Sequence, residues 1–145
     1  MKNFLRFAAA LVFVLVATSV SAADKAKDTA APPEPSYDTA TVIDVTGTVT
    51  EVREVPKGSP ADGLHLILQS GLQTLDVYVG PAEFVKIFEV TFVKGDNIHV
   101  IGSKVMFGDS TLLLAREVTI GTVTLLCRDK DGAPLWRYFI KPPVG

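Results

Sequence analysis

Two side chains in this sequence, His65 and Asp76, could act together in acid–base chemistry. They lie in two apolar stretches, residues 64–69 and 72–79, on either side of Ser70-Gly71, a dipeptide that predicts a two-residue hairpin turn. In an antiparallel hairpin with this turn, residue 65 faces residue 76. A carboxylate beside an imidazole can fix its tautomer and raise its pKa, as in a general base or a pH sensor. An ordinary cross-strand contact is the alternative, because the spacing brings no Ser, Cys or metal ligand to the pair.

The other residues with reactive side chains give weaker patterns. A metal site would need His99 beside His65 and Asp76, but His99 falls on a strand that is not predicted to neighbour them. The chain has one Cys, Cys127, which excludes an intramolecular disulfide. It shares its side of a strand with apolar neighbours, so we predict a buried, inert thiol, with a disulfide between chains as the alternative. We therefore predict no metal and no cofactor.

The elements that must position these residues are mainly strands. Residues 41–52 form a strand rich in β-branched residues, in which the valine phase breaks after Val49 and Gly47 suits a bend. The hairpin follows, with Leu64, Leu66, Leu68, Leu75 and Val77 on a core face. Residues 80–88 predict a short helix, residues 98–105 and 111–120 two further strands, and residues 122–128 and 135–140 a last strand pair. This order predicts an all-β, five-stranded OB-fold Greek-key barrel with one short helix between strands three and four, plus a C-terminal strand pair.

Four stretches carry a resemblance to a known group: VTGTVTEV, VYVGPAEF, VKGDNIHVIGSKV and LLLAREV, all within residues 41–120. With the later GAPLW, they resemble small exported bacterial OB-fold proteins of the nucleic-acid-binding-OB-like superfamily. The resemblance implies a binding module whose ligand lies on strands two and three and on the loop of residues 56–63. The implied binding residues are those on the half-polar face of the hairpin: His65, Ile67, Gln69, Thr74, Asp76 and Tyr78.

This face does not have the chemistry of a nucleic-acid site. Single-strand binding needs a basic groove with stacking aromatic rings, whereas here Tyr78 is the only aromatic residue and Asp76 the only carboxylate. The chain has 14 basic and 16 acidic residues, and loss of Lys2 and Arg6 with a leader would lower its net charge to −4. Charge and composition therefore argue against nucleic acid as a partner.

The N-terminus predicts export. Lys2 and Arg6 precede an apolar run, residues 7–17, that is too short to span a bilayer, and Val20-Ser21-Ala22 then provides the residues of a cleavage site. We expect a signal peptide at residues 1–22, a disordered Ala/Pro/charged linker at 23–40, the barrel at 41–120, and a C-terminal hairpin with an aromatic tail at 121–145. The protein would then be periplasmic or secreted, with no membrane span after leader removal.

These patterns favour a non-catalytic exported binding or accessory module of the cell envelope, with an unknown protein or small ligand as its partner. Two alternatives stay open: a small hydrolase or metal-dependent enzyme that uses His65 and Asp76, and an oligonucleotide-binding domain. The aromatic tail around Trp136 is predicted to cap one end of the barrel, and an exposed recognition patch is the alternative.

Overall fold

The computed structural model describes residues 34–141. The predicted signal peptide and residues 23–33 of the predicted linker lie outside the described residues. The chain forms the following elements: η2 (Thr39–Thr41), β1 (Val42–Val55), β2 (Gly63–Ser70), β3 (Gln73–Gly80), α1 (Ala82–Ile87), β4 (Asn97–Phe107), β5 (Ser110–Ile120), β6 (Val123–Leu126) and η3 (Leu135–Tyr138), where η denotes a 3₁₀ helix. Within the described part of the chain, no helix is long and apolar enough to cross a membrane.

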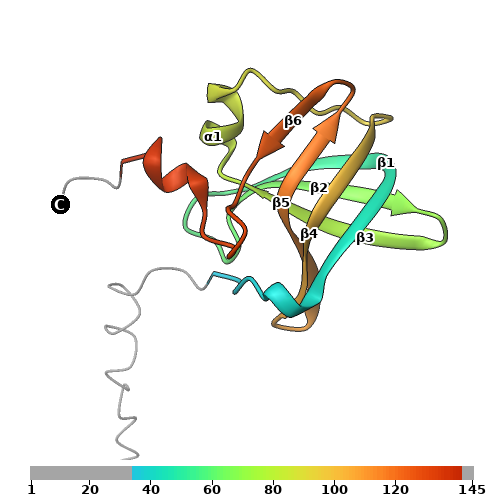
Figure 1. Ribbon diagram of the computed structural model, residues 1–145, viewed down its shortest axis with the longest axis horizontal. Coiled ribbons are helices and arrows are strands. Elements are labelled where there is room, and N and C mark those ends of the chain that lie inside the picture. The colour runs from blue at the N-terminus through green and yellow to red at the C-terminus, as the bar shows by residue number, and fades with distance from the viewer. Residues whose placement is uncertain (1–33, 142–145) are drawn as a thin grey trace, which may run out of the picture. The chain divides into compact units, whose positions relative to one another are not determined.

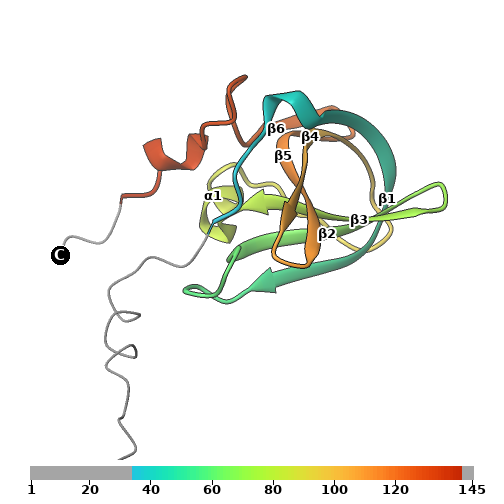
Figure 2. The same cartoon turned by 90° about the horizontal axis from the view of Figure 1, so that it is seen from below.

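Five strands close into a barrel. Their order is β3-β2-β1-β4-β5, all neighbours being antiparallel, and a short parallel pairing of β3 with β5 closes the ring. β6 pairs only with β5 and lies outside the ring. Figure 2 shows the ring end-on, with β1 curving round one side of it. The predicted fold class is confirmed: the protein is an all-β, five-stranded barrel with one short helix between β3 and β4.

β1 is long because it belongs to both halves of the barrel. Its first half, residues 42–48, pairs with β4, and its second half, residues 48–55, pairs with β2. The register with β2 shifts between Val49 and Glu51. This irregularity lies where the alternation of valines in the sequence breaks, after Val49. Gly47 lies near the point where β1 changes its partner strand from β4 to β2. An added Cβ on Gly47 would collide with the backbone oxygen of Gln69 and lie 2.9 Å from Leu68 Cγ. The residue at this position must therefore be glycine for β1 to curl onto β2.

The β2–β3 turn differs by one residue from the prediction. Ser70 pairs with Gln73, so the two turn residues are Gly71 and Leu72, and His65 lies directly opposite Tyr78 instead of Asp76. Gly71 has a φ of +59°, which fits the first central position of a type II′ turn, where glycine is required. Moving the turn by one residue shifts each predicted partner by two residues, from 76 to 78 for His65. Because side chains alternate between the two faces with a period of two, each residue stays on its predicted face.

The predicted C-terminal strand pair is only half correct. β6 forms, but its partner is β5, and residues 135–140 begin with the 3₁₀ helix η3. Arg128 and Pro134 make an isolated bridge, so the chain does turn back at this point. Pro134 has no N–H to donate to a continued ladder, and the chain coils beyond it. Figures 1 and 2 show η3 and α1 on the same side of the barrel, away from the β2–β3 turn.

The described end of the predicted linker packs on the barrel. Tyr37 is partly buried against the cluster that contains Tyr78 and Leu114. The backbone N–H of Asp38 donates to Ser103 Oγ at 3.0 Å, and Ser103 Oγ donates to the backbone oxygen of Asp38 at 2.8 Å. Residues 37 and 38 of the predicted linker are therefore anchored on the barrel, by one aromatic ring and by one buried serine.

We expect Gly47→Val to destabilise the protein by about 1–3 kcal/mol, because its side chain would overlap the backbone of β2. Lys57→Ala is the control, since the Lys57 side chain is exposed and pairs only with exposed Glu83; it should change stability by less than about 0.5 kcal/mol. Urea unfolding of both variants measures the difference. Equal midpoints would show that β1 can curl without the close approach at Gly47.

Candidate functional site

His65 is buried with both ring nitrogens in use. Its Nδ1 lies 2.8 Å from Asp76 Oδ1, and its Nε2 lies 2.7 Å from the backbone oxygen of Ala61. The side chain is only 5% exposed, whereas that of Asp76 is 29% exposed. The structure thus brings His65 and Asp76 into contact, as predicted, although they meet diagonally across the hairpin and not in direct opposition.

The two partners of His65 favour its protonated form. A carboxylate and a carbonyl oxygen both accept hydrogen bonds, so a neutral imidazole, with one N–H, satisfies only one of them. Burial lowers the pKa of His65, but the hydrogen bonds to Asp76 and Ala61 outweigh it and raise the pKa above its ordinary value. Protonation of His65 would therefore satisfy both internal acceptors at once.

This arrangement ties a loop to the barrel. Ala61, which accepts from His65, lies in the loop of residues 56–62 and has a φ of +53°, a left-handed conformation that costs free energy in a non-glycine residue. The hydroxyl of Tyr78 donates to the backbone oxygen of Asp62 at 3.0 Å, and its ring packs 5.1 Å from that of His65. Both side chains therefore hold the loop in place through contacts inside the protein.

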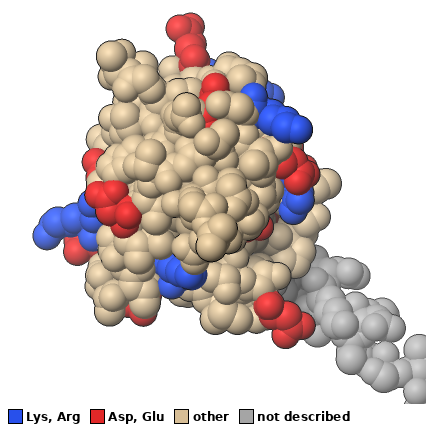
Figure 3. Space-filling model, turned by 90° about the vertical axis from the view of Figure 1, so that its right-hand side faces the viewer, with Lys and Arg blue, Asp and Glu red and all other residues tan. Residues whose placement is uncertain are grey.

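The six predicted ligand residues fall into two groups on the hairpin. His65, Asp76 and Tyr78 gather at the loop end, and Ile67 lies opposite Asp76 in register. Towards the turn, Thr74 Oγ1 donates to Gln69 Oε1 at 2.8 Å. Figure 3 views the molecule from the side of this turn and shows charged side chains of both signs scattered over the surface. Ligand binding by this face stays a prediction, with Gln69, Thr74 and Asp76 as the polar groups open to solvent.

The sequence did not indicate a second histidine–carboxylate pair on β1 and β4. His99 contacts Asp44 through its Nε2, and both side chains are exposed. β1 and β4 are neighbours in the barrel, which places residues 44 and 99 on adjacent strands. The available signal was the predicted Greek-key order, because such a barrel pairs its first strand with its fourth. Among the described residues, no group of three His, Cys, Asp or Glu side chains is placed to hold a metal ion. Cys127 is buried, as predicted, and burial raises the pKa of its thiol to about 12.

A buried arginine fixes the C-terminal segment. The Arg128 guanidinium stacks 4.9 Å from the Trp136 ring centroid and 5.8 Å from that of Tyr37, and its Nη1 donates to the Gly132 oxygen. Trp136 in turn packs edge-on against Tyr78 and at a tilted angle against Phe84 of α1. Trp136 therefore packs on the barrel, whereas Tyr138 and Phe139 of the same tail are more than half exposed. Arg128 is the residue that the sequence patterns did not indicate.

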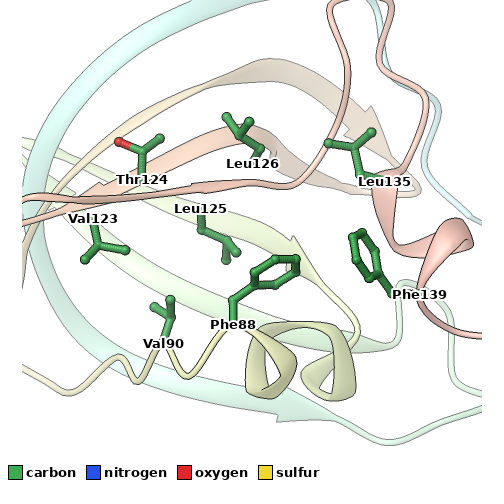
Figure 4. A pocket seen from close by; sticks show the side chains of 8 residues that line it. All are labelled: Phe88, Val90, Val123, Thr124, Leu125, Leu126, Leu135 and Phe139. Carbon is green, nitrogen blue, oxygen red and sulfur yellow. The ribbon is translucent and has the colours of Figure 1, made fainter.

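An open apolar groove lies beside this C-terminal segment. It has a volume of about 360 Å³ and is lined by all four residues of β6, by Phe88 and Val90 after α1, and by Leu135 and Phe139 of the C-terminal segment. Figure 4 shows Val123 and Leu125 directed towards Phe88 and Val90, with Leu135 and Phe139 at one end. No lining residue carries a charge. Phe88, Val123, Leu126 and Phe139 are each between 43% and 52% exposed, so this is the part of the described surface where large apolar side chains concentrate.

A second groove, of about 640 Å³, lies on another part of the surface, between the end of β1, the start of α1 and the C-terminal segment. Its lining mixes acidic residues such as Glu54 and Glu83 with basic residues such as Lys86 and Arg137. Opposite charges in one groove do not select for either an anionic or a cationic ligand.

The described residues thus define a small closed β-barrel with an internally satisfied histidine and an open apolar groove. A family model described as the MamS/MamX magnetosome protein family matches residues 41–125, more than half of the chain. This chain belongs to the MamS/MamX magnetosome protein family. The match corrects the resemblance to OB-fold proteins of the nucleic-acid-binding-OB-like superfamily, which was wrong. No curated protein matches the chain.

The stability that His65 provides should depend on pH. Because its folded-state pKa is raised, this contribution is fully present below the unfolded pKa of about 6.5 and is lost as pH rises through the folded pKa. We expect the stability advantage of the wild type over His65→Gln to be largest at acidic pH and to shrink towards alkaline pH. Urea unfolding between pH 5 and 9 measures this, with exposed His99→Gln as the control. An advantage that stays constant over this range would mean that the pKa of His65 is the same in the folded and the unfolded protein.

Proposed function

We propose that this protein is a non-catalytic accessory protein of magnetosome formation that acts by contacting another protein. The family membership of residues 41–125 supports the cellular process. The observation that carries the mode of action is the apolar groove, because soluble proteins rarely leave several large apolar side chains together in solvent unless they cover them with a partner. The uncharged lining favours a partner that buries aliphatic or aromatic side chains there.

The geometry around His65 supports a structural role over a catalytic one. A general base must reach the proton that it abstracts, and both nitrogens of His65 already contact internal acceptors. Asp76 keeps part of its carboxylate open to solvent, but no Ser or Cys hydroxyl or thiol is hydrogen-bonded to the pair in the described part of the chain. We therefore place function in protein contact and not in hydrolysis or metal chemistry.

We further propose that the protein works outside the cytoplasm, in the periplasm or as a secreted protein. The support is the three-part pattern of residues 1–22: a basic start, an apolar run, and small residues at a cleavage site. The acidic balance that remains after loss of Lys2 and Arg6 gives no attraction to nucleic acid or to an anionic membrane surface.

Complementation of a deletion strain tests the proposed function. Deletion of the gene in the producing cell should lower the number of magnetosomes seen by electron microscopy, and the wild type should restore it. We expect Phe139→Asp to fail, because it places a charge in the groove, and Leu72→Asp to succeed, because Leu72 is fully exposed at the β2–β3 turn on the opposite side.

Asp76→Asn discriminates the catalytic alternative in the same strain. It keeps the shape of the side chain and removes the carboxylate, so we expect it to restore magnetosomes. Unfolding curves of each purified variant show which ones fold. If folded Asp76→Asn fails while Phe139→Asp succeeds, the function lies at the His65–Asp76 pair and the proposal is wrong.

Export predicts removal of the leader next to Ala22. N-terminal sequencing or intact-mass measurement of the protein recovered from the producing cell should find Ala23 as the first residue. A recovered protein that still begins at Met1 would contradict cleavage and place the apolar run of residues 7–17 in the working protein.

A further inference from the structure

The apolar groove runs along the open edge of β6. Successive residues of a strand point to opposite faces of its sheet, so a groove on one face would touch only alternate residues. This groove touches all four, from Val123 to Leu126. It therefore follows the edge that β5 leaves free, and Figure 1 shows β6 as the last strand of the sheet.

Two residues of β6 direct their backbone groups towards this edge. The two-residue turn after Ile120 makes Ile120 and Val123 a hydrogen-bonded pair, and such pairs alternate along an antiparallel ladder. Leu125 then bonds to β5, and so does Cys127, whose N–H donates to the Arg116 oxygen at 2.8 Å. Thr124 and Leu126 alternate with these residues, so their N–H and C=O groups point away from β5.

Nothing within residues 34–141 pairs with these backbone groups. The hydrogen bonds of the described chain outside its helices and strands include none from the backbone of Thr124 or Leu126. The Thr124 hydroxyl contacts Thr119 Oγ1 on β5 at 2.8 Å, so it does not cover the edge. β6 also lacks the lysine or proline with which proteins usually protect an edge strand.

We propose that a second copy of this chain pairs with β6 across this edge, and that the groove is the centre of a two-fold dimer interface. The proposal names the occupant of the groove and rests on the proposed function in treating the groove as a contact surface. An antiparallel pair centred on Leu125 sets Thr124 opposite Leu126 of the partner subunit, and Leu126 opposite the partner subunit's Thr124. All the free backbone groups of both strands are then satisfied at once, which an isologous contact requires.

Charge supports a second copy as the occupant. Two copies of an acidic protein repel each other unless they meet where neither carries charge, and the groove lining is uncharged. The chain's own residues 23–33 do not match the groove, because they include Asp24, Lys25, Lys27 and Asp28. The exposed side chains that would be covered, Phe88, Val123 and Leu126, are apolar in both copies.

Sedimentation equilibrium of the purified protein tests the dimer with a matched pair of variants. Thr124→Pro removes the outward N–H and the hydroxyl contact to Thr119 but breaks no backbone hydrogen bond to β5, because proline is tolerated on an edge strand where its nitrogen faces solvent. Thr124→Ala also loses the contact to Thr119 but keeps the N–H. We expect the wild type and Thr124→Ala to form dimers, and Thr124→Pro to raise the dimer dissociation constant at least tenfold. Leu126→Lys, which puts a charge in the groove, should have the same effect.

Amide hydrogen exchange localises the contact, and thermal melts check that the variant is folded. In the wild type, the amides of Thr124 and Leu126 should become more protected as protein concentration rises, while the other amides of the barrel stay unchanged. Thermal melts at low concentration should show that Thr124→Pro keeps its fold.

Two results overturn the dimer. The proposal is wrong if the wild type is monomeric at every concentration. It is also wrong if Thr124→Pro dimerises as well as Thr124→Ala. Failure of the dimer is separable from failure of the proposed function: a monomeric wild type with an inactive Phe139→Asp in cells means that the groove binds a different protein. A dimer with an active Phe139→Asp means that the groove pairs copies but is not the functional contact.

Discussion

The close approach of β1 to β2 at Gly47 is the constraint on which the rest of this barrel depends. One strand can pair with β4 through its first half and with β2 through its second half only if its backbone comes within contact distance of the Gln69 carbonyl. Once β1 curls, β3 and β5 are brought together and the ring closes with only two parallel residue pairs. The apolar faces of five strands then enclose a single core, which α1 covers with Phe84 and Val85.

His65 and Arg128 bring nitrogen-bearing side chains into the apolar interior, and aromatic rings accompany both. At the hairpin, His65 is held between Asp76 and Ala61 with the Tyr78 ring beside it. At the C-terminal segment, Arg128 lies between two rings and bonds to a carbonyl. Burial lowers the pKa of Arg128, and the rings partly offset the lost hydration of its charge. Tyr78 and Trp136 touch, so the two sites share one aromatic cluster that joins the loop, the barrel and the tail.

The features that the sequence predicted are those that local patterns determine. Alternation identified the core face of the hairpin, and the break after Val49 identified the bulge. The one-and-four spacing of Phe84, Val85 and Phe88 identified the helix. The turn register was wrong because Ser70-Gly71 and Gly71-Leu72 are both acceptable dipeptides, and only the left-handed φ of Gly71 selects between them. The stacking of Arg128 between Tyr37 and Trp136 was not predictable, because those residues are far apart in the chain and meet only after the barrel has formed. The family assignment failed for a related reason: motifs set by barrel geometry recur in unrelated proteins and do not identify a function.

β6 lies outside the ring of strands that encloses the core and pairs only with β5. Each of the five barrel strands has a strand neighbour on both sides, although the β3–β5 pairing that closes the ring spans only two residue pairs. β6 adds one more strand and thereby moves the open edge out of the ring, next to Phe88 and Phe139. A strand in this position contributes Leu125 and the adjoining Cys127 to the core while leaving alternate backbone groups free. Changes on its outer edge therefore do not reach Gly47, His65 or the closed ring of strands.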